Sequence, residues 1–556
     1  MMLFVVLCAG TVSACAGENG VPATAGGAAT VAASQSATAP PPWVADPGGP
    51  SLFDHVTDHA RALAGEPYRA PDADLAGSVA ALTYGQHRGI RFREEATIWR
   101  DEALFRLQLF HPGAGSDTPV RVHLIEEGVD RVVEFEVARF AYGDELADVE
   151  LDVPPGAGHA GFRLLYPLNR RDHLDEVVSF LGASYFRLLG PGHVYGLSTR
   201  GIAVDIGLPT DEEFPDFTDF WVVRPDASAT SLVFFALLDG PSLTGAYRFE
   251  LSPGGPLTEV RESAPSPTVL AVDARLFARH DIAKLGVAPL TSMYLHGTFR
   301  PGGEDDFRPR VHDSEGLLMH TSRGEWIWRP LTNRVGARVT SLRDRDPEGF
   351  GLVQRSRDFG AYMDLETQYH RRPSEWIAVE GTWGAGGVEL LEIPTQSEFN
   401  DNIAAYWVPD EPLRAGEERT YRYRLVTFDE RLETDVLPDG KVLEGQRLAS
   451  VVRTRIGWDA LPGQSSPPPR AHRRVVVDFA GAGLPELPAS ADVAAVVSTS
   501  AGEISDVQVQ SIPGGGRRAT FALDATGEPG ADIRLFLQHA DSAVSETWSY
   551  LWEPRP

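Results

Sequence analysis

Two aspartates stand in polar turns beside apolar, strand-like runs and could perform acid–base chemistry. Asp313 follows Val311-His312, and Asp401 directly precedes the run NIAAYWV. Cleavage of a glycosidic bond needs one group to protonate the departing oxygen and another to activate water. Two carboxyl groups in differently polar surroundings can take these two parts. Each aspartate could instead bond the backbone of its own turn, and the sequence alone does not bring them together.

Aromatic and charged residues are concentrated in the same window, residues 310–410, which holds five of the 11 tryptophans. Indole faces pack on the apolar faces of pyranose rings, while arginines and carboxylates bond sugar hydroxyls. The window therefore predicts a tryptophan-lined glucan groove, and its alternative is tryptophan packing between two sheets. The residues predicted to bind substrate are Trp326, Trp328, Arg329, Arg355, Trp376, Trp383 and Glu398.

Three other motifs give weaker indications of chemistry. The run 196–200 is similar to a nucleophile elbow around Ser198, but it ends in arginine and has no strand–turn–helix frame. Gly384 to Gly387 opens no predicted helix, which favours a turn over a phosphate site. His55 and His59 lie one helical turn apart without a third ligand nearby. No CxxC or HExxH motif occurs, so we expect neither a metal nor a cofactor.

Composition narrows the classes of partner. The chain of 556 residues carries 50 Lys and Arg against 78 Asp and Glu, a net charge of −28. Such a chain repels nucleic-acid phosphates and anionic lipid headgroups, so we expect no nucleic-acid role. Hydrophobic residues make up 42% of the chain, enough for a core, while 55 Gly and 42 Pro favour many turns between short strands.

The first residues predict export. Residues 1–15 contain an apolar run that is too short to span a bilayer and is typical of a signal sequence. Its end resembles a lipobox with Cys15 as the lipidated residue, while the alternative is an A-x-A-like cleavage site after Ala16. Residues 16–50, rich in Ala, Gly, Ser, Thr and Pro, predict a disordered linker. No later apolar run is long enough to cross a membrane, so only a lipid anchor would attach the protein to one.

The remaining sequence predicts a fold dominated by β-strands. Apolar spacing predicts a helix within 51–67, a second helix over 172–190 and a short one over 211–223, among many short alternating strands. Three consecutive prolines mark a linker near residue 467. Beyond it, strands separated by frequent turns predict a small Ig-like sandwich.

We therefore expect a large β domain over residues 51–460 and a small one over 468–556. Both cysteines, Cys8 and Cys15, precede these domains, so no disulfide is expected within them.

Several phrases, taken in order, resemble the osmoregulated periplasmic glucan biosynthesis proteins of the G and D types. They are LGVAPLTSM, VHDSEGLL, GEWIWRPL, GFGLVQRSRDF, RRPSEW and EFNDNIAAYWVP. The resemblance covers nearly all of residues 51–556. It implies a large galactose-mutarotase-like β-sandwich with a long cleft, followed by an Ig-like domain, in a protein of the periplasm.

The resemblance also implies a substrate and residue roles. Members similar to the D type are inverting β-1,2-glucanases and some relatives are transglycosylases, whereas G-type members have been regarded as scaffolds. On this sequence the general acid falls on Asp401, the base side on Asp313, and Tyr369 would order the water relay. No cofactor is implied, and the inner-membrane glucan synthase is an implied partner.

Three hypotheses of function follow. The first is an enzyme that cuts or transfers β-1,2-glucan with Asp401 and Asp313. The second is a non-catalytic module that binds nascent glucan and docks on the synthase. The third is a lipoprotein that binds starch or host glycans. The family's usual acidic residues are glycines at positions 85 and 89 here, which leaves linkage preference and product size open.

Overall fold

A computed structural model describes residues 40–554 except 41, 46–48, 72–76, 115–117, 147–152, 154–157, 256–265, 299–301, 303–304, 438–439, 461–462, 486 and 489–490. The signal sequence, Cys15 and most of the 16–50 linker therefore lie outside the described residues. Residues 42–45 of that linker are described: Val44 bridges Val129, and the backbone nitrogen of Ala45 donates to the carbonyl of Gly128. This short stretch is held along a strand.

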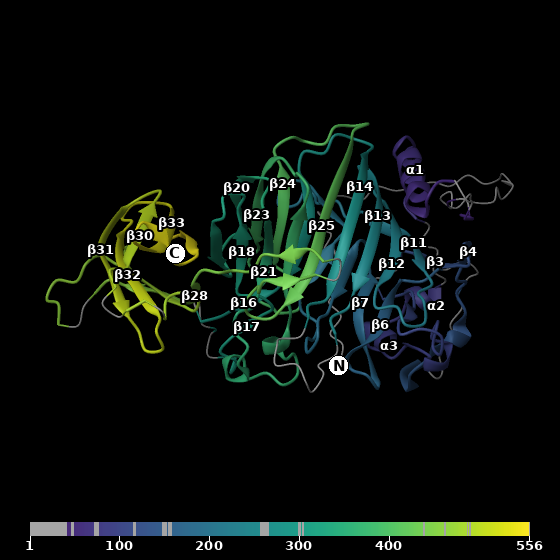
Figure 1. Ribbon diagram of the computed structural model, residues 1–556, viewed down its shortest axis with the longest axis horizontal. Helices are drawn as coiled ribbons and strands as arrows, with labels where there is room; N and C mark the ends of the chain where they lie inside the picture. The colour runs from purple at the N-terminus through teal and green to yellow at the C-terminus, as the bar shows by residue number, and fades with distance from the viewer. Residues whose placement is uncertain are drawn as a thin grey trace, which may run out of the picture.

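Two large sheets pack face to face and form the body of the molecule (Figure 1). The first has the order β2-β6-β7-β8-β9-β15-β24-β23-β20, with β10 paired to β15. Its Phe180 contacts Phe234 and Phe249 of the second sheet, so a continuous apolar core fills the space between them. The strands are β2 (Arg106–Phe110), β6 (Gly161–Arg170), β7 (His173–Leu181), β8 (Tyr185–Leu188), β9 (Ser198–Arg200), β10 (Ile202–Val204), β15 (Leu285–Ser292), β20 (Arg338–Arg345), β23 (Ala385–Glu392) and β24 (Ile403–Pro409).

The second sheet runs in the order β30-β33-β35-β19-β18-β21-β22-β25-β14-β13-β12-β11-β3-β4, with β34 paired to β33. Its strands come from both ends of the chain. They are β3 (Arg121–Glu126), β4 (Val129–Val132), β11 (Asp216–Val223), β12 (Leu232–Asp239), β13 (Leu243–Ser252), β14 (Val269–Ala278), β18 (Gly316–His320), β19 (Trp326–Pro330), β21 (Gly349–Val353), β22 (Ser374–Glu380), β25 (Glu418–Phe428), β30 (Ala494–Thr499), β33 (Ala531–His539), β34 (Ser542–Ala543) and β35 (Thr547–Trp552).

The C-terminal part, which projects from the body in Figure 1, is joined to it by a parallel pairing of β19 with β35. A four-stranded sheet in the order β28-β29-β32-β31 completes this part, from β28 (Ser450–Trp458), β29 (His472–Ala480), β31 (Glu503–Ser511) and β32 (Arg517–Asp524). Strand β28, which lies within the expected 51–460 domain, pairs with β29 beyond the proline-rich linker.

Three two-stranded pairs and several short helices complete the described chain. The pairs are β1 (Arg91–Phe92) with β5 (Phe140–Ala141), β16 (Tyr294–His296) with β17 (Val311–His312), and β26 (Asp435–Val436) with β27 (Val442–Leu443). The short helices are α2 (Gly77–Ala80), α3 (Tyr84–Arg88), η1 (Glu94–Ala96), η2 (Val137–Arg139), η3 (Asp144–Leu146), η4 (Phe359–Ala361) and η5 (Tyr369–Arg371).

The first predicted helix is confirmed as α1 (Leu52–Ala64). Ser51 caps it by accepting a hydrogen bond from the Asp54 nitrogen, and Gly65 ends it. Its buried face, including Phe53 and Val56, packs on the outer side of the second sheet against Trp221 and Phe235. Among the described residues, no helix is long and apolar enough to cross a membrane.

The other two predicted helices are wrong. Residues 172–190 form the hairpin of β7 and β8, and residues 216–223 form β11. Gly182 and Ala183 have positive φ angles, and the Tyr185 nitrogen donates to the Gly182 carbonyl, which makes a tight turn where the helix was expected. Pairing of β7 with β6 satisfies its backbone, so the tertiary context decided between two structures that the apolar spacing allowed.

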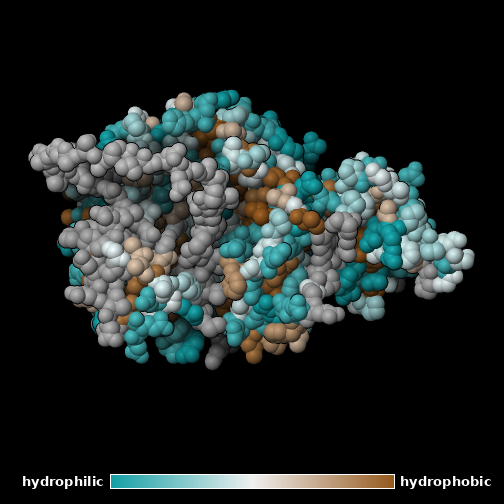
Figure 2. Space-filling view, turned by 180° about the vertical axis from the view of Figure 1, so that it is seen from behind, coloured by the Kyte–Doolittle hydropathy of each residue, from teal (hydrophilic) through white to brown (hydrophobic). Residues whose placement is uncertain are grey.

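The face of the molecule opposite Figure 1 carries both hydrophilic and hydrophobic side chains. Figure 2 shows hydrophilic side chains over most of the coloured surface on the side opposite Figure 1. Its sheets make the described chain a mostly β protein, with a large sheet region and a small four-stranded sheet.

Candidate active site

The two aspartates are brought near each other because one short backbone segment, residues 292–293, is hydrogen-bonded to both of their turns. Strand β15 pairs with β24, which Asp401 precedes, and the following β16 pairs with β17, which Asp313 follows. The Asn402 nitrogen donates to the Ser292 carbonyl over 3.1 Å, and the Asp313 nitrogen donates to the Met293 carbonyl over 2.9 Å. Successive carbonyls of one segment thus fix two turns that lie far apart in the sequence.

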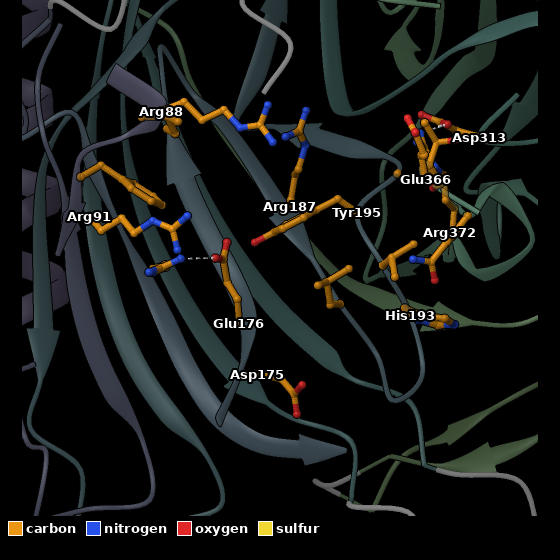
Figure 3. A pocket seen from close by; sticks show the side chains of 18 of the residues that line it. Arg88, Arg91, Asp175, Glu176, Arg187, His193, Tyr195, Asp313, Glu366 and Arg372 are labelled. Carbon is orange, nitrogen blue, oxygen red and sulfur yellow. Dashed lines mark hydrogen bonds and ion pairs between the residues drawn. The ribbon is translucent and has the colours of Figure 1, made fainter. Parts of the chain in front are cut away.

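Both aspartates line one open cavity of about 930 Å³. Tyr369, Arg372 and Glu398 line it as well. Figure 3 shows Asp313, Glu366 and Arg372 toward one end of this cavity and Arg88, Arg91 and Glu176 toward the other. The residues that line the cavity extend from α3 and β1 to the loops that carry the two aspartates.

Asp313 is buried, with 3% of its surface exposed, and it pairs with Arg372. Burial raises the pKa of its carboxyl to about 6, Arg372 opposes that rise, and the nearby charge of Asp401 adds to it. The Arg372 guanidinium also lies 4.2 Å from the ring centre of Tyr369. A Cβ at Gly196 would come within 2.8 Å of the Arg372 side chain, so glycine leaves room for this arginine.

Tyr369 belongs to a second charged group beside the pair. Its hydroxyl donates to Glu398 Oε2 over 2.6 Å, and Arg308 donates to the same oxygen over 2.8 Å. Arg308 also bonds Asp306 and Asp364. The Tyr369 pKa lies well above its usual value, chiefly because the ring is buried. The phenol therefore stays protonated and serves as a fixed donor.

Asp401 has a different environment from Asp313. It is only partly buried, and its Oδ2 accepts a hydrogen bond of 3.4 Å from the neutral hydroxyl of Ser198. The Ser198 hydroxyl is 2.5 Å from that of Thr291. Asn402 fixes the turn, because its side chain accepts from the Tyr294 nitrogen over 2.8 Å and donates to the Ile393 carbonyl over 2.8 Å. One carboxyl is thus paired with a cation, whereas the other accepts a hydrogen bond from a neutral hydroxyl.

The predicted tryptophan-lined groove is not what the structure shows around the aspartates. Among the described residues that line the cavity, none is a tryptophan. Trp326, Trp328 and Trp376 belong to a buried cluster with Phe521 and Trp548 of the C-terminal part, because these side chains face that part rather than the cavity. Trp383 is buried in the core between the two large sheets.

Two predicted arginines also serve the junction with the C-terminal part. Arg355 stacks 3.6 Å from the Trp328 ring centre and pairs with the buried Glu546 over 2.6 Å. Arg329 is 1% exposed and donates to the hydroxyl of Ser549 over 3.2 Å. Of the residues predicted to bind substrate, Glu398 alone lines the cavity among those described.

Replacement of Trp376 by alanine tests this placement. Trp376 is 2% exposed and stacks on Trp326 with ring centres 5.5 Å apart. We expect Trp376→Ala to lower the free energy of unfolding by about 3–5 kcal/mol, measured by chemical denaturation, because it leaves a cavity in a packed cluster. Unchanged stability together with weakened glucan binding would contradict the core assignment.

The arginines that line the cavity were not among the residues predicted to bind substrate. Arg372 stands in the run Arg371-Arg372-Pro373, three residues after Tyr369, and a charged pair beside an aromatic was a usable signal. Arg187 lies on β8, inside the segment expected to be helical, so its direction could not be foreseen. Ser198 lies on β9 beside Asp401 and Thr291, without the strand–turn–helix frame of a nucleophile elbow.

Glu375 is a further buried acid behind the site. It lies on β22 with 0% exposure, and it accepts a 3.1 Å hydrogen bond from Thr199, the neighbour of Ser198. Its other oxygen has no hydrogen-bond partner among the described residues. Burial raises the pKa of this carboxyl to about 8. Glu375 is therefore mostly neutral at pH 7.

The raised pKa predicts a pH-dependent stability. The folded carboxyl binds its proton more tightly than the unfolded one, so its contribution is complete below pH 4.5 and declines as the pH rises toward about 8. Between about pH 5 and about pH 8 the protein should lose roughly 3 kcal/mol of unfolding free energy through this group. Glu375→Gln, which keeps an acceptor for Thr199, should remove that part of the loss. If the unfolding free energy fell equally with pH in the wild-type protein and in Glu375→Gln, Glu375 would not be the source of the loss.

The described residues offer no evident metal centre. No group of three or more His, Cys, Asp or Glu side chains within them is arranged to hold a metal ion. Gly384 has a φ of 80° in the turn between β22 and β23, as a tight turn requires.

Two facing sheets and an open cavity lined by two aspartates define a mostly β protein with one candidate site. A family model, described as periplasmic glucan biosynthesis protein, MdoG, matches residues 52–552. The chain belongs to this family, which confirms the resemblance seen in the sequence. Its role in periplasmic glucan biosynthesis follows from that membership.

Proposed function

We propose that this protein acts on β-1,2-glucan in the periplasm, as an inverting glucanase or transglycosylase with Asp401 and Asp313 as its catalytic pair. The observation that carries the proposal is the convergence of these two carboxyls in one open cavity, in unlike surroundings. Unlike surroundings are what an acid and a base at one pH require.

The chemistry divides between the two carboxyls. Asp401 donates a proton to the glycosidic oxygen as the bond to the anomeric carbon breaks, and a water attacks that carbon from the opposite face. The proton of this water passes to Asp313 through a water chain and a substrate hydroxyl. Tyr369, held by Glu398, orders that chain. In transglycosylation a sugar hydroxyl replaces the attacking water.

The ion pair supports this division of roles. A pKa of about 6, raised chiefly by burial, would by itself suit Asp313 to the role of the acid. The Arg372 guanidinium, however, bonds its carboxylate form, so the group is ionised above that pH and suits a base.

A pH profile checks the base. Because the carboxylate form of Asp313 is required, kcat/KM should fall about tenfold for each pH unit below pH 6. The measurement is the initial rate of glucan shortening between about pH 4 and about pH 8. A rate that does not decline on the acid side would remove Asp313 from the reaction.

The decisive experiment is digestion of linear β-1,2-glucan by the purified protein, with the chain lengths of the products followed over time. Shortening supports an enzyme, and products longer than the starting chains indicate transfer. Binding without shortening supports the second candidate, a glucan-binding scaffold that assists the inner-membrane synthase. The exposed strand β31, at the edge of the four-stranded sheet, favours that candidate as a docking strand. Affinity for α-glucans alone would support the third hypothesis.

The same proposal includes the roles of the N-terminal residues and the fold types of the two domains. Residues 1–15 are a signal sequence, with Cys15 as a lipid anchor in one of two alternatives, and the linker precedes a galactose-mutarotase-like domain and an Ig-like domain. The face-to-face packing of the large sheets supports the first fold name, and the two-layered C-terminal part supports the second.

A further inference from the structure

The first large sheet ends in a strand with one unpaired edge within the described chain. Strand β20 pairs with β23 along all eight of its residues, and it is the last strand in the order of that sheet. Figure 1 shows β20 on the side of the body that faces the C-terminal part. The backbone N–H and C=O groups along this free edge can therefore form hydrogen bonds with another extended chain.

An open groove of about 1000 Å³ lies along the free edge. Residues 341–345 of β20 and the following Asp346 all line it. Because successive side chains of a strand point to opposite faces, one space reaches all of them only if it runs along the edge of the strand. The opposite wall comes from the turn between β18 and β19, from Ile327 and from Arg534 of β33. At about 3.3 Å per residue, this edge accommodates an extended segment roughly 20 Å long.

Hydrogen bonds hold the walls of the groove in place. Asp344 accepts from the backbone nitrogen and from the hydroxyl of Ser322, both over 2.8 Å, which ties β20 to the turn before β19. Glu325 of that turn pairs with Arg534 and accepts from Thr547 over 2.6 Å, which ties the turn to the C-terminal part. The groove is therefore fixed between ordered elements.

The two faces of β20 offer different chemistry to a segment beside it. Leu342 packs against the core between the large sheets, to which the groove residue Ile327 also belongs, so this face is apolar. Arg343 and Arg345 alternate with Leu342, point to the other face and are exposed. Acidic side chains are therefore favoured opposite the arginines, and apolar ones opposite Leu342.

We propose that the free edge of β20 binds an extended segment of a partner protein in which acidic and apolar side chains alternate, so that the segment adds a strand to the first sheet. Main-chain hydrogen bonds to β20 supply affinity, and the alternating side chains supply specificity. Arg323 on the opposite wall and Arg345 on β20 form no ion pair with a described residue, so both are free to bind carboxylates. A second copy of β20 fits less well, because two-fold antiparallel pairing sets arginine opposite arginine.

Binding of short peptides tests this docking surface. The probe is a fluorescently labelled eight-residue peptide in which glutamate alternates with valine. One control peptide has lysine in place of glutamate, and the other has all of its glutamates before its valines. We expect fluorescence anisotropy at low salt to give a Kd about tenfold lower for the probe than for either control. Hydrogen exchange of residues 341–346 should slow when the probe is bound, because an added strand covers their amides.

Charge reversal locates the binding site. Arg345→Glu should raise the Kd of the probe about tenfold and lower that of the lysine peptide, since the charge beside the bound strand changes sign. Arg447→Glu is the matched control, because Arg447 is exposed but does not line the groove, and it should change neither Kd. Thermal unfolding of both variants shows that the fold is kept. Neither residue lines the cavity of the two aspartates, so glucan shortening should be unchanged in both.

Equal Kd values for the probe and the lysine peptide, or no binding of any peptide, would overturn the proposal and leave the arginines as protection of a free edge against aggregation. Equal binding of the two acidic peptides, or unchanged exchange of residues 341–346, would rule out strand addition. A dimer that pairs through β20 and resists the probe would give the edge to a second copy instead. The proposed function fails independently, through the absence of glucan shortening.

Discussion

Asp401→Asn should reduce kcat for the shortening of linear β-1,2-glucan by about 10³-fold, with a much smaller change in KM, because asparagine cannot deliver a proton to the departing oxygen. The substitution preserves the shape of the side chain and an oxygen that can still accept from Ser198. The folded structure should therefore persist. The measurement is the initial rate of appearance of reducing ends at substrate concentrations around KM.

A matched control is Asp410→Asn. Asp410 follows β24, the strand that Asp401 precedes, and it pairs with Arg343 at the surface, outside the cavity. We expect its substitution to leave the rate within about twofold, as surface changes away from special features usually do. If Asp401→Asn retained a rate close to that of this control, Asp401 would not be the acid.

The second large effect is expected for Asp313→Asn, which should lower kcat/KM by about 10³-fold and remove the rise of activity with a pKa near 6. It should also destabilise the protein by about 3–5 kcal/mol, because it leaves the buried guanidinium of Arg372 without its carboxylate. Activity and stability are therefore measured together, by glucan digestion and by denaturant unfolding.

A double variant separates the two consequences. Asp313→Asn combined with Arg372→Met removes the uncompensated charge, so it should recover much of the lost stability. It should not recover activity, because the base is still missing. A double variant that regains glucan shortening would show that Asp313 acts only as a structural partner of Arg372.

The sequence by itself determined the local features of this protein. The first helix was expected within residues 51–67, and it begins after Ser51 and ends at Gly65, since a cap depends on neighbouring residues. Frequent turns and alternating apolar residues predicted the β-rich chain, because side chains on a strand alternate between its two faces. The order of the family phrases gave the family that the comparison confirmed.

Only the tertiary structure decided which residues meet and which way they face. Residues 172–190 became a hairpin because β6 satisfies the backbone of β7, and the tryptophans turned to the C-terminal part because β35 pairs beside β19. The same cause brings Asp313 and Asp401 together: hydrogen bonds to the carbonyls of Ser292 and Met293 are long-range contacts. Local spacing carries no information on such contacts, since sheet pairing joins strands regardless of their separation along the chain.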